Sequence, residues 1–337
     1  MRKWKITAMS LPIIWSSLLN KKHDRLIWIG LRKLEKYMAN NNRERNQMKI
    51  LVSFSGGKDS QACLIQAAKQ YGTDKIEAVF CDTGWEHPAT YQHITDVCTQ
   101  MGVKLTTLKS KYDFVSLAVH KKRFPSTNAR FCTSELKMKP MIDYVLSLTE
   151  SCIIIQGIRA AESAARAAME DECMYFKSYF QLNKNGKKET YRGKEVREWC
   201  SKYDASVIRP IFHWTSQDVI DCILNARQKP NPLYYKGFSR VGCFPCIMCR
   251  KREVLQLMQD ESMKQRLLAA EQLMREKTER GSTFFPPTYI PRYACTNRRY
   301  PTVEDVFRYV TDKNATLDAF EPEGGYACMS MFHGLCE

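Results

Sequence analysis

A strand, a glycine turn and the start of a helix follow one another within a few residues, and this stretch constrains the fold most. The apolar run Ile50–Phe54 leads into Ser55–Ser60, which reads Ser-Gly-Gly-Lys-Asp-Ser, and a helix-compatible segment, Gln61–Tyr71, comes next. Glycines let a backbone approach a ligand closely, and the unpaired N–H groups of a first helical turn carry the positive end of the helix dipole. The stretch therefore predicts an anion site, most often for phosphate.

The spacing of this turn excludes two common phosphate-binding motifs. It fits neither the G-x-G-x-x-G fingerprint of dinucleotide-binding folds nor the G-x-x-x-x-G-K-[ST] pattern of Walker loops. What it contains is S-G-G-x-D-S directly after a strand. The structural alternative is an incidental Gly-Gly turn before a core helix.

Expected strands and helices alternate from Met48 onward. Helices of about three turns separate the strands, which is the pattern of β-α-β units. The sequence therefore predicts an α/β fold with a doubly wound parallel sheet, whose ligands bind beyond the carboxyl ends of the strands. The expected strands are Ile50–Phe54, Ile76–Phe80, Val103–Leu108, Cys152–Gln156 and Val207–Phe212.

Three regions differ in composition. Residues 1–47 contain three tryptophans and a basic, polar stretch, and we interpret them as an N-terminal appendage outside the nucleotide-binding core. Residues 48–228 form the expected α/β domain. Residues 229–337 form a mostly helical cysteine-cluster region, in which Glu253–Arg280 is predicted to be one long amphipathic helix.

Charge and cysteine content restrict the partners and the compartment. The chain has 52 Lys and Arg against 36 Asp and Glu, a formal charge of +16, which favours a polyanionic partner, with nucleic acid ahead of a membrane surface. Fourteen cysteines occur without a convincing signal peptide, and the apolar run Ile6–Leu19 is too short to span a bilayer. We expect a cytoplasmic protein, with no membrane partner, whose thiols serve metal binding or chemistry.

The cysteines at C-x-x-C spacing predict a metal centre. Cys243 and Cys246 begin a C-x-x-C-x-x-C run that ends at Cys249. Such a run suits an iron–sulfur cluster, and two of its thiols with a distant pair would equally make a four-cysteine zinc site. We rank Cys328 and Cys336 first as the distant pair, with Cys249 and Cys132 competing for a ligand position; scattered core cysteines are the structural alternative.

Several stretches, in the same order along about Met48 to Glu337, resemble the phosphoadenylyl-sulfate (PAPS) reductase-like family of the ATP pyrophosphatase, or PP-loop, superfamily. The similarity extends to the relatives found in phages and in DNA phosphorothioation. It rests on the motifs Ser55–Ser60, Asp82-Thr83-Gly84 with Glu86-His87-Pro88, Arg130-Phe131-Cys132-Thr133 with Leu136-Lys137 and Pro140, Gly157-Ile158-Arg159 with Glu162-Ser163 and Arg166, Arg209-Pro210-Ile211 with Trp214, Gly242–Cys246, and the final Gly334-Leu335-Cys336-Glu337.

The resemblance implies an adenine-nucleotide α-hydrolase-like fold, ATP or PAPS as ligand, and often a [4Fe-4S] cluster, with zinc as the alternative. The nucleotide-binding residues would be Ser55, Gly56, Gly57, Asp59, Ser60, Asp82 and Gly157. Asp82 could accept a hydrogen bond from ribose or adenine, and a loop-capping role is the alternative for it.

Four charged residues are the candidate catalytic groups. Asp59 would bridge to Mg²⁺, because an acidic group does not favour bare phosphate. Arg159 and Arg166 could clamp phosphate or sulfate, with a solvated helix position as the alternative for Arg166. Lys58 either meets a phosphate or points to solvent. Outside these four, Lys137 could bind an anion or merely begin its helix.

One departure from the family affects the predicted reaction. PAPS reductases have a C-terminal E-C-G-I-H-type motif, and this chain ends instead in Gly-Leu-Cys-Glu. We therefore predict an ATP-dependent sulfurtransferase-like enzyme that cleaves ATP to AMP and pyrophosphate, with nucleic acid as the favoured acceptor. Reduction of PAPS or adenylyl sulfate is the alternative, and a non-catalytic nucleic-acid-binding protein with a zinc knuckle is the second. A cysteine desulfurase or a thioredoxin-like donor would be a partner, and both a monomer and an oligomer are compatible with the sequence.

Overall fold

The computed structural model describes residues 48–182, 186–278, 283–313 and 315. The chain divides into two units, Met1–Met48 and Lys49–Glu337. The predicted appendage, residues 1–47, lies outside the described residues, as do Cys328 and Cys336. No helix among the described residues is long and apolar enough to cross a membrane.

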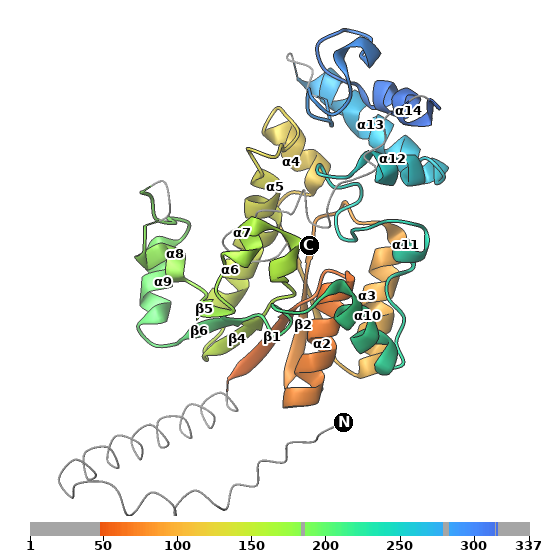
Figure 1. Ribbon diagram of the computed structural model, residues 1–337. Helices are drawn as coiled ribbons and strands as arrows, with labels where there is room; N and C mark the ends of the chain where they lie inside the picture. Colours follow the sequence, from red (N-terminus) through yellow and green to blue (C-terminus); the bar gives the residue numbers. More distant parts are fainter. Residues whose placement is uncertain (1–47, 183–185, 279–282, 314, 316–337) are drawn as a thin grey trace, which may run out of the picture. The chain divides into compact units, whose positions relative to one another are not determined.

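The core of the unit Lys49–Glu337 is a six-stranded sheet in the order β3-β2-β1-β4-β6-β5. Figure 1 labels β1, β2, β4, β5 and β6 of this sheet. Each neighbouring pair is parallel except β5 with β6, which is antiparallel. The predicted doubly wound α/β fold is confirmed. The strands are β1 (Lys49–Ser53), β2 (Ile76–Asp82), β3 (Lys104–Lys109), β4 (Cys152–Ile155), β5 (Glu172–Met174) and β6 (Ala205–Ile208).

Helices pack on the sheet because its central strands are apolar on both faces: every residue of Ile50–Ser53 is buried. An apolar cluster joins Leu51 and Val79 to Met141 of α6 and to Trp199 of α9. The helices of this part are α2 (Lys58–Tyr71), α3 (Pro88–Met101), α4 (Phe114–His120), α5 (Phe131–Thr133), α6 (Lys139–Leu146), α7 (Ala164–Ala167), α8 (Lys177–Phe180), α9 (Gly193–Cys200) and α10 (Ser216–Asn225), with a π-helical turn at Ser134–Met138 and a 3₁₀ turn at Ala160–Glu162.

The part of the chain after α10 is mostly helical, as predicted. It contributes to one apolar cluster that also contains Trp85 and Phe114 of the α/β part. The domain boundary at 228/229 therefore stays a prediction. The helices here are α11 (Pro232–Tyr235), α12 (Lys251–Leu257), α13 (Glu261–Lys277) and α14 (Val303–Thr311), with a 3₁₀ turn at Arg292–Ala294.

Two expected elements differ from the structure. The helix expected over Glu253–Arg280 is broken, because Asp260 turns its side chain to the N–H of Met263 and caps a new helix, α13. The strand expected over Val207–Phe212 ends at Ile208, just before Arg209 and Pro210, where the missing proline N–H ends strand pairing.

Candidate functional site

The turn after β1 has the geometry that its glycines predicted. Gly56 has φ +81°, and a Cβ there would lie 2.9 Å from side-chain atoms of Thr90 and Ile94. Gly57 caps α2 without any side-chain hydrogen bond. Ser60 Oγ donates to the Gly57 carbonyl at 3.0 Å and lies 3.3 Å from Ser55 Oγ. The two serine hydroxyls therefore stabilise the turn, and its two glycines leave the backbone there without Cβ atoms.

Gly157, after β4, closes against the first turn of α2. A Cβ at this position would lie 2.8 Å from the backbone N of Ser60 and from the carbonyl carbon of Asp59. Backbone atoms cannot move aside as a flexible side chain can. The loops after the two central strands thus approach each other at the point where the strand order reverses, which is where doubly wound sheets bind ligands.

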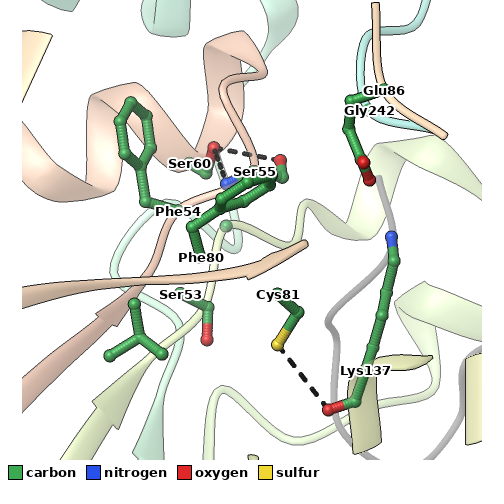
Figure 2. A pocket seen from close by; sticks show the side chains of 11 residues that line it. Ser53, Phe54, Ser55, Ser60, Phe80, Cys81, Glu86, Lys137 and Gly242 are labelled. Atoms are coloured by element: carbon green, nitrogen blue, oxygen red, sulfur yellow. Dashed lines mark hydrogen bonds between the residues drawn. The ribbon is translucent and has the colours of Figure 1, made fainter. Parts of the chain in front are cut away.

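A pocket opens at this point (Figure 2). Ser53 Oγ lies in its wall, is buried and has no hydrogen-bond partner among the described residues. A buried hydroxyl without a partner is costly, so a ligand atom is its natural complement. The lining residues are Ser53, Phe54, Ser55, Ser60, Val79, Phe80, Cys81, Glu86, Lys137, Gly157 and Gly242.

The predicted charged residues form buried ion pairs beside this pocket. Arg159 Nε donates to Asp59 Oδ1 at 2.5 Å, and Lys58 Nζ lies 3.3 Å from the other carboxylate oxygen. Arg166 is buried, not solvated, and pairs with Glu162. The structure thus brings Lys58, Asp59 and Arg159 together, and it engages the Asp59 carboxylate that was expected to meet Mg²⁺.

Asp82 stabilises the loop after β2. Its Oδ1 accepts from Tyr91 Oη at 2.7 Å and from the Gly84 N–H at 2.8 Å, and Lys109 Nζ lies 3.4 Å from Oδ2. Burial by itself raises the pKa of Asp82, but these hydrogen bonds and the Lys109 charge outweigh it and lower the pKa. These contacts are those of a loop-capping carboxylate, and Asp82 is not among the residues that line the pocket.

Two charged pocket residues lie outside the predicted catalytic and nucleotide-binding set. Glu86 is buried and accepts hydrogen bonds from Thr83 and Tyr91. Lys137 is buried in the π-helical turn, a type of distortion common at functional sites, and its amine points toward the Glu86 carboxylate in Figure 2. Lys137 was a possible anion ligand in the sequence, but only the fold shows that its side chain lines this pocket.

Three thiols line a second pocket next to the first. Cys132, Cys243 and Cys246 are in its wall together with Lys137, which both pockets share. The β-bridge between Glu86 and Cys243 brings the C-x-x-C run to the end of β2. Burial raises the pKa of Cys249, which does not line this pocket.

No group of three or more His, Cys, Asp or Glu side chains within the described ranges is arranged to hold a metal ion. Two of the four predicted ligands, Cys328 and Cys336, lie outside those ranges. The ligand set of Cys243, Cys246, Cys328 and Cys336 therefore stays a prediction.

Two histidines, His87 and His213, make structural contacts. His87 caps α3 by accepting the Ala89 N–H at Nδ1, and its Nε2 lies 3.4 Å from Asp260 of the helical part. Burial lowers the pKa of His87. His213 stacks edge-on against Phe212. Neither histidine is among the residues that line the two pockets.

The chain is similar to several known proteins. Residues 49–249, more than half of the chain, match the phosphoadenosine phosphosulfate reductase domain. A protein of Escherichia phage 186, described as an uncharacterized 37.8 kDa protein, is 29% identical over 85% of this chain and 96% of its own length. An uncharacterized protein of Methanocaldococcus jannaschii is 31% identical over 61% of this chain, which spans only 38% of that protein.

Among solved structures, PAPS reductase from Candida auris, crystallised as a phosphate complex, is similar with a TM-score of 0.40 and 18% identity. The similarity covers 59% of this chain and 82% of that protein.

Proposed function

The chain belongs to the phosphoadenosine phosphosulfate reductase family, within the PP-loop superfamily, and from this membership we propose that it uses ATP to activate an acceptor for sulfur transfer. Membership supports a nucleotide-using enzyme. The reaction, the acceptor and the metal are the parts of the proposal that go beyond membership.

One observation carries the proposal: the nucleotide pocket and the thiol pocket are adjacent and share Lys137. The first pocket has the Ser55 and Ser60 hydroxyls and the N-terminus of α2 at its edge, which suits phosphate. The second offers sulfur atoms. An enzyme that must bring an activated group to a sulfur source needs this adjacency.

The proposed reaction has two displacements. An acceptor oxygen attacks the α-phosphorus of ATP; the O–P bond forms, pyrophosphate leaves with the electron pair, and the proton that the acceptor loses passes to water. Sulfide, delivered by a donor protein, then attacks the acceptor carbon and AMP leaves. Charge develops on phosphate oxygens in both steps, and we assign its stabilisation to Lys137, which lines the pocket, and to the amides at the start of α2.

Mg²⁺ fits this site only as a companion of the nucleotide. Its preferred carboxylate, Asp59, is paired with Arg159 and Lys58. We propose that the phosphates and water supply most of its ligands, as is common for Mg²⁺ in nucleotide sites.

We propose that a [4Fe-4S] cluster binds at the thiol pocket, although the three described thiols there are not already arranged around a metal ion. Cys132, Cys243 and Cys246 line it and would hold three irons, and Cys328 or Cys336 is the candidate for the fourth. In this proposal Cys132 replaces either Cys328 or Cys336 in the predicted ligand set. When bound, the cluster would carry electrons or sulfur. Zinc on the same thiols is the alternative.

Nucleic acid is the proposed acceptor, because the chain carries a formal charge of +16. To test the reaction, anaerobically purified protein is incubated with α-labelled ATP, sulfide and either tRNA or duplex DNA. The proposal expects AMP and thiolated nucleic acid in equal amounts. AMP formation without any thiolated product from either nucleic acid would remove the acceptor assignment.

Reduction of PAPS to sulfite is the second candidate, and the family match itself favours it. Sulfite release from PAPS with thioredoxin as the reductant would establish it. The two reactions differ in their first product, since the reductase releases adenosine bisphosphate and needs no ATP.

A further inference from the structure

One short segment of the helical part is bound to the turn after β1. Asn231 is completely buried, and its Nδ2 donates to the Gly56 carbonyl at 3.2 Å while its Oδ1 accepts the Leu233 N–H. Gln61 of α2 donates to Gln228 Oε1 at 2.9 Å. Residues 228–234 therefore pack closely along the turn, and we call them the strap.

The strap ends in Tyr234, which contacts Lys58 twice. The Tyr234 hydroxyl accepts the backbone N–H of Lys58 at 3.0 Å, and the Lys58 ammonium lies 5.4 Å from the centre of the tyrosine ring. Lys58 is the first residue of α2, so this N–H is one of those that a bound anion would use. Tyr234 thus occupies both positive groups of Lys58.

The contact between Tyr234 and Lys58 affects which groups of the turn line the pocket. Among the described residues that line it, Ser55 and Ser60 come from the turn, and Lys58 is not included. Ser53 Oγ, in a residue that is 8% exposed, lines the same pocket without a hydrogen-bond partner in the described part of the chain. The pocket therefore suits a polar ligand, but the backbone N–H of Lys58, at its phosphate-binding end, already donates to the hydroxyl of Tyr234.

We propose that Tyr234 is a latch that a phosphate group of the nucleotide displaces from Lys58. A phosphate oxygen is charged and the phenol oxygen is not, so its hydrogen bond to the Lys58 amide is about twice as strong and also gains from the α2 dipole. The ligand class is a pyrophosphate-bearing nucleotide. The latch rests on the proposed function, because it presumes that nucleotide phosphates bind at this end of α2.

The latch makes a prediction with a definite sign. In the free protein the hydroxyl satisfies the Lys58 N–H, and in the bound state the phosphate does. Replacing the hydroxyl with hydrogen leaves that N–H without its acceptor only in the free state. Binding should therefore tighten by about three- to tenfold, the effect of one net hydrogen bond.

The test is a calorimetric titration of the full chain with inorganic pyrophosphate. Tyr234→Phe keeps the ring over Lys58, and Tyr235→Phe is the matched control, because Tyr235 is 69% exposed. The latch expects a Kd about three- to tenfold lower for Y234F, an unchanged Kd for Y235F, and a larger pyrophosphate-induced rise in Tm for Y234F.

Equal or weaker binding by Y234F, with wild type binding pyrophosphate, would overturn the latch and leave the proposed function standing. Absence of binding by the wild type to both pyrophosphate and ATP would overturn the two together.

Discussion

The Nε atom of Arg159 lies 2.5 Å from Oδ1 of Asp59, and both side chains are almost fully buried. The two residues come from opposite sides of the switch point, Asp59 from the first turn of α2 and Arg159 from the loop after β4. The pair therefore ties together the two loops that frame the nucleotide pocket.

Removing only Arg159 should lower the free energy of unfolding more than replacing both Arg159 and Asp59. Arg159→Met leaves the Asp59 charge buried beside Lys58 without its arginine partner, and we expect a loss of about 3 kcal/mol in the free energy of unfolding. Adding Asp59→Asn should restore at least half of it. Urea unfolding measures both; a double variant no more stable than the single one would argue against this role of the pair. Lys202→Met, in an exposed pair with Glu198, is the control and should change less than about 1 kcal/mol.

Gly157→Ala should damage the pocket. The new Cβ would sit 2.8 Å from backbone atoms of Asp59 and Ser60, so the two loops must separate, at about 1–3 kcal/mol. We expect lower stability and weaker ATP binding by calorimetry. Gly193→Ala is the control, since its Cβ would meet only Arg197, at 3.6 Å. Unchanged ATP binding by Gly157→Ala would mean that this close approach is unimportant.

Glu77 predicts how stability depends on pH. Burial by itself raises its pKa, but hydrogen bonds from Thr106, Tyr144 and Lys104 and the charge of Lys49 prevail and lower the pKa from 4.5 to about 2. A lowered folded-state pKa contributes stability above the unfolded value of about 4.5, which is lost as pH falls toward 2. The contribution at neutral pH is about 3 kcal/mol.

Glu77→Gln should therefore flatten the fall of unfolding free energy between about pH 5 and about pH 2. Urea unfolding across that range measures it. Glu276→Gln, at an exposed position of α13, should leave the slope unchanged. Equal slopes for Glu77→Gln and wild type would show that Glu77 is not the group responsible.

The thiol pocket predicts which cysteines hold metal. Cys132→Ser, Cys243→Ser and Cys246→Ser should each lower bound iron and sulfide and the visible absorbance of the cluster, because three of the four ligands are proposed to lie in that pocket. Cys200→Ser, on the half-buried edge of α9, is the control. Full metal content in Cys132→Ser would return its place to the distant pair Cys328 and Cys336.

The sequence was informative where structure is local. The strand–turn–helix at Ile50–Tyr71 follows from an apolar run and two glycines that are adjacent in the sequence. The parallel sheet follows from the alternation of expected strands and helices along the chain. The break before α13 arises because the side chain of Asp260 caps a new helix. The spacing of apolar residues does not predict this break.

The site itself was predicted only in part. Lys137 and Glu86 stand in motifs noted in the sequence, but their side chains meet at the pocket because distant elements fold onto one another, and Tyr234 reaches Lys58 across 176 residues of chain. No local sequence pattern predicts contacts between residues so far apart in the chain. For Asp82 the sequence left a nucleotide contact and a loop-capping role open; the hydrogen bonds from Tyr91 and Gly84 are those of a loop cap, and the nucleotide contact stays a prediction.

Cleavage of ATP between its α- and β-phosphates is the core of the proposed function, and exchange of labelled pyrophosphate into ATP measures it without intermediates being isolated. We predict that label enters ATP when acceptor nucleic acid is present, and that Lys137→Met, which removes a buried cation from the pocket, lowers the exchange rate at least about tenfold. Release of ADP and phosphate from ATP, with no label entering ATP under any condition, would contradict the proposed cleavage.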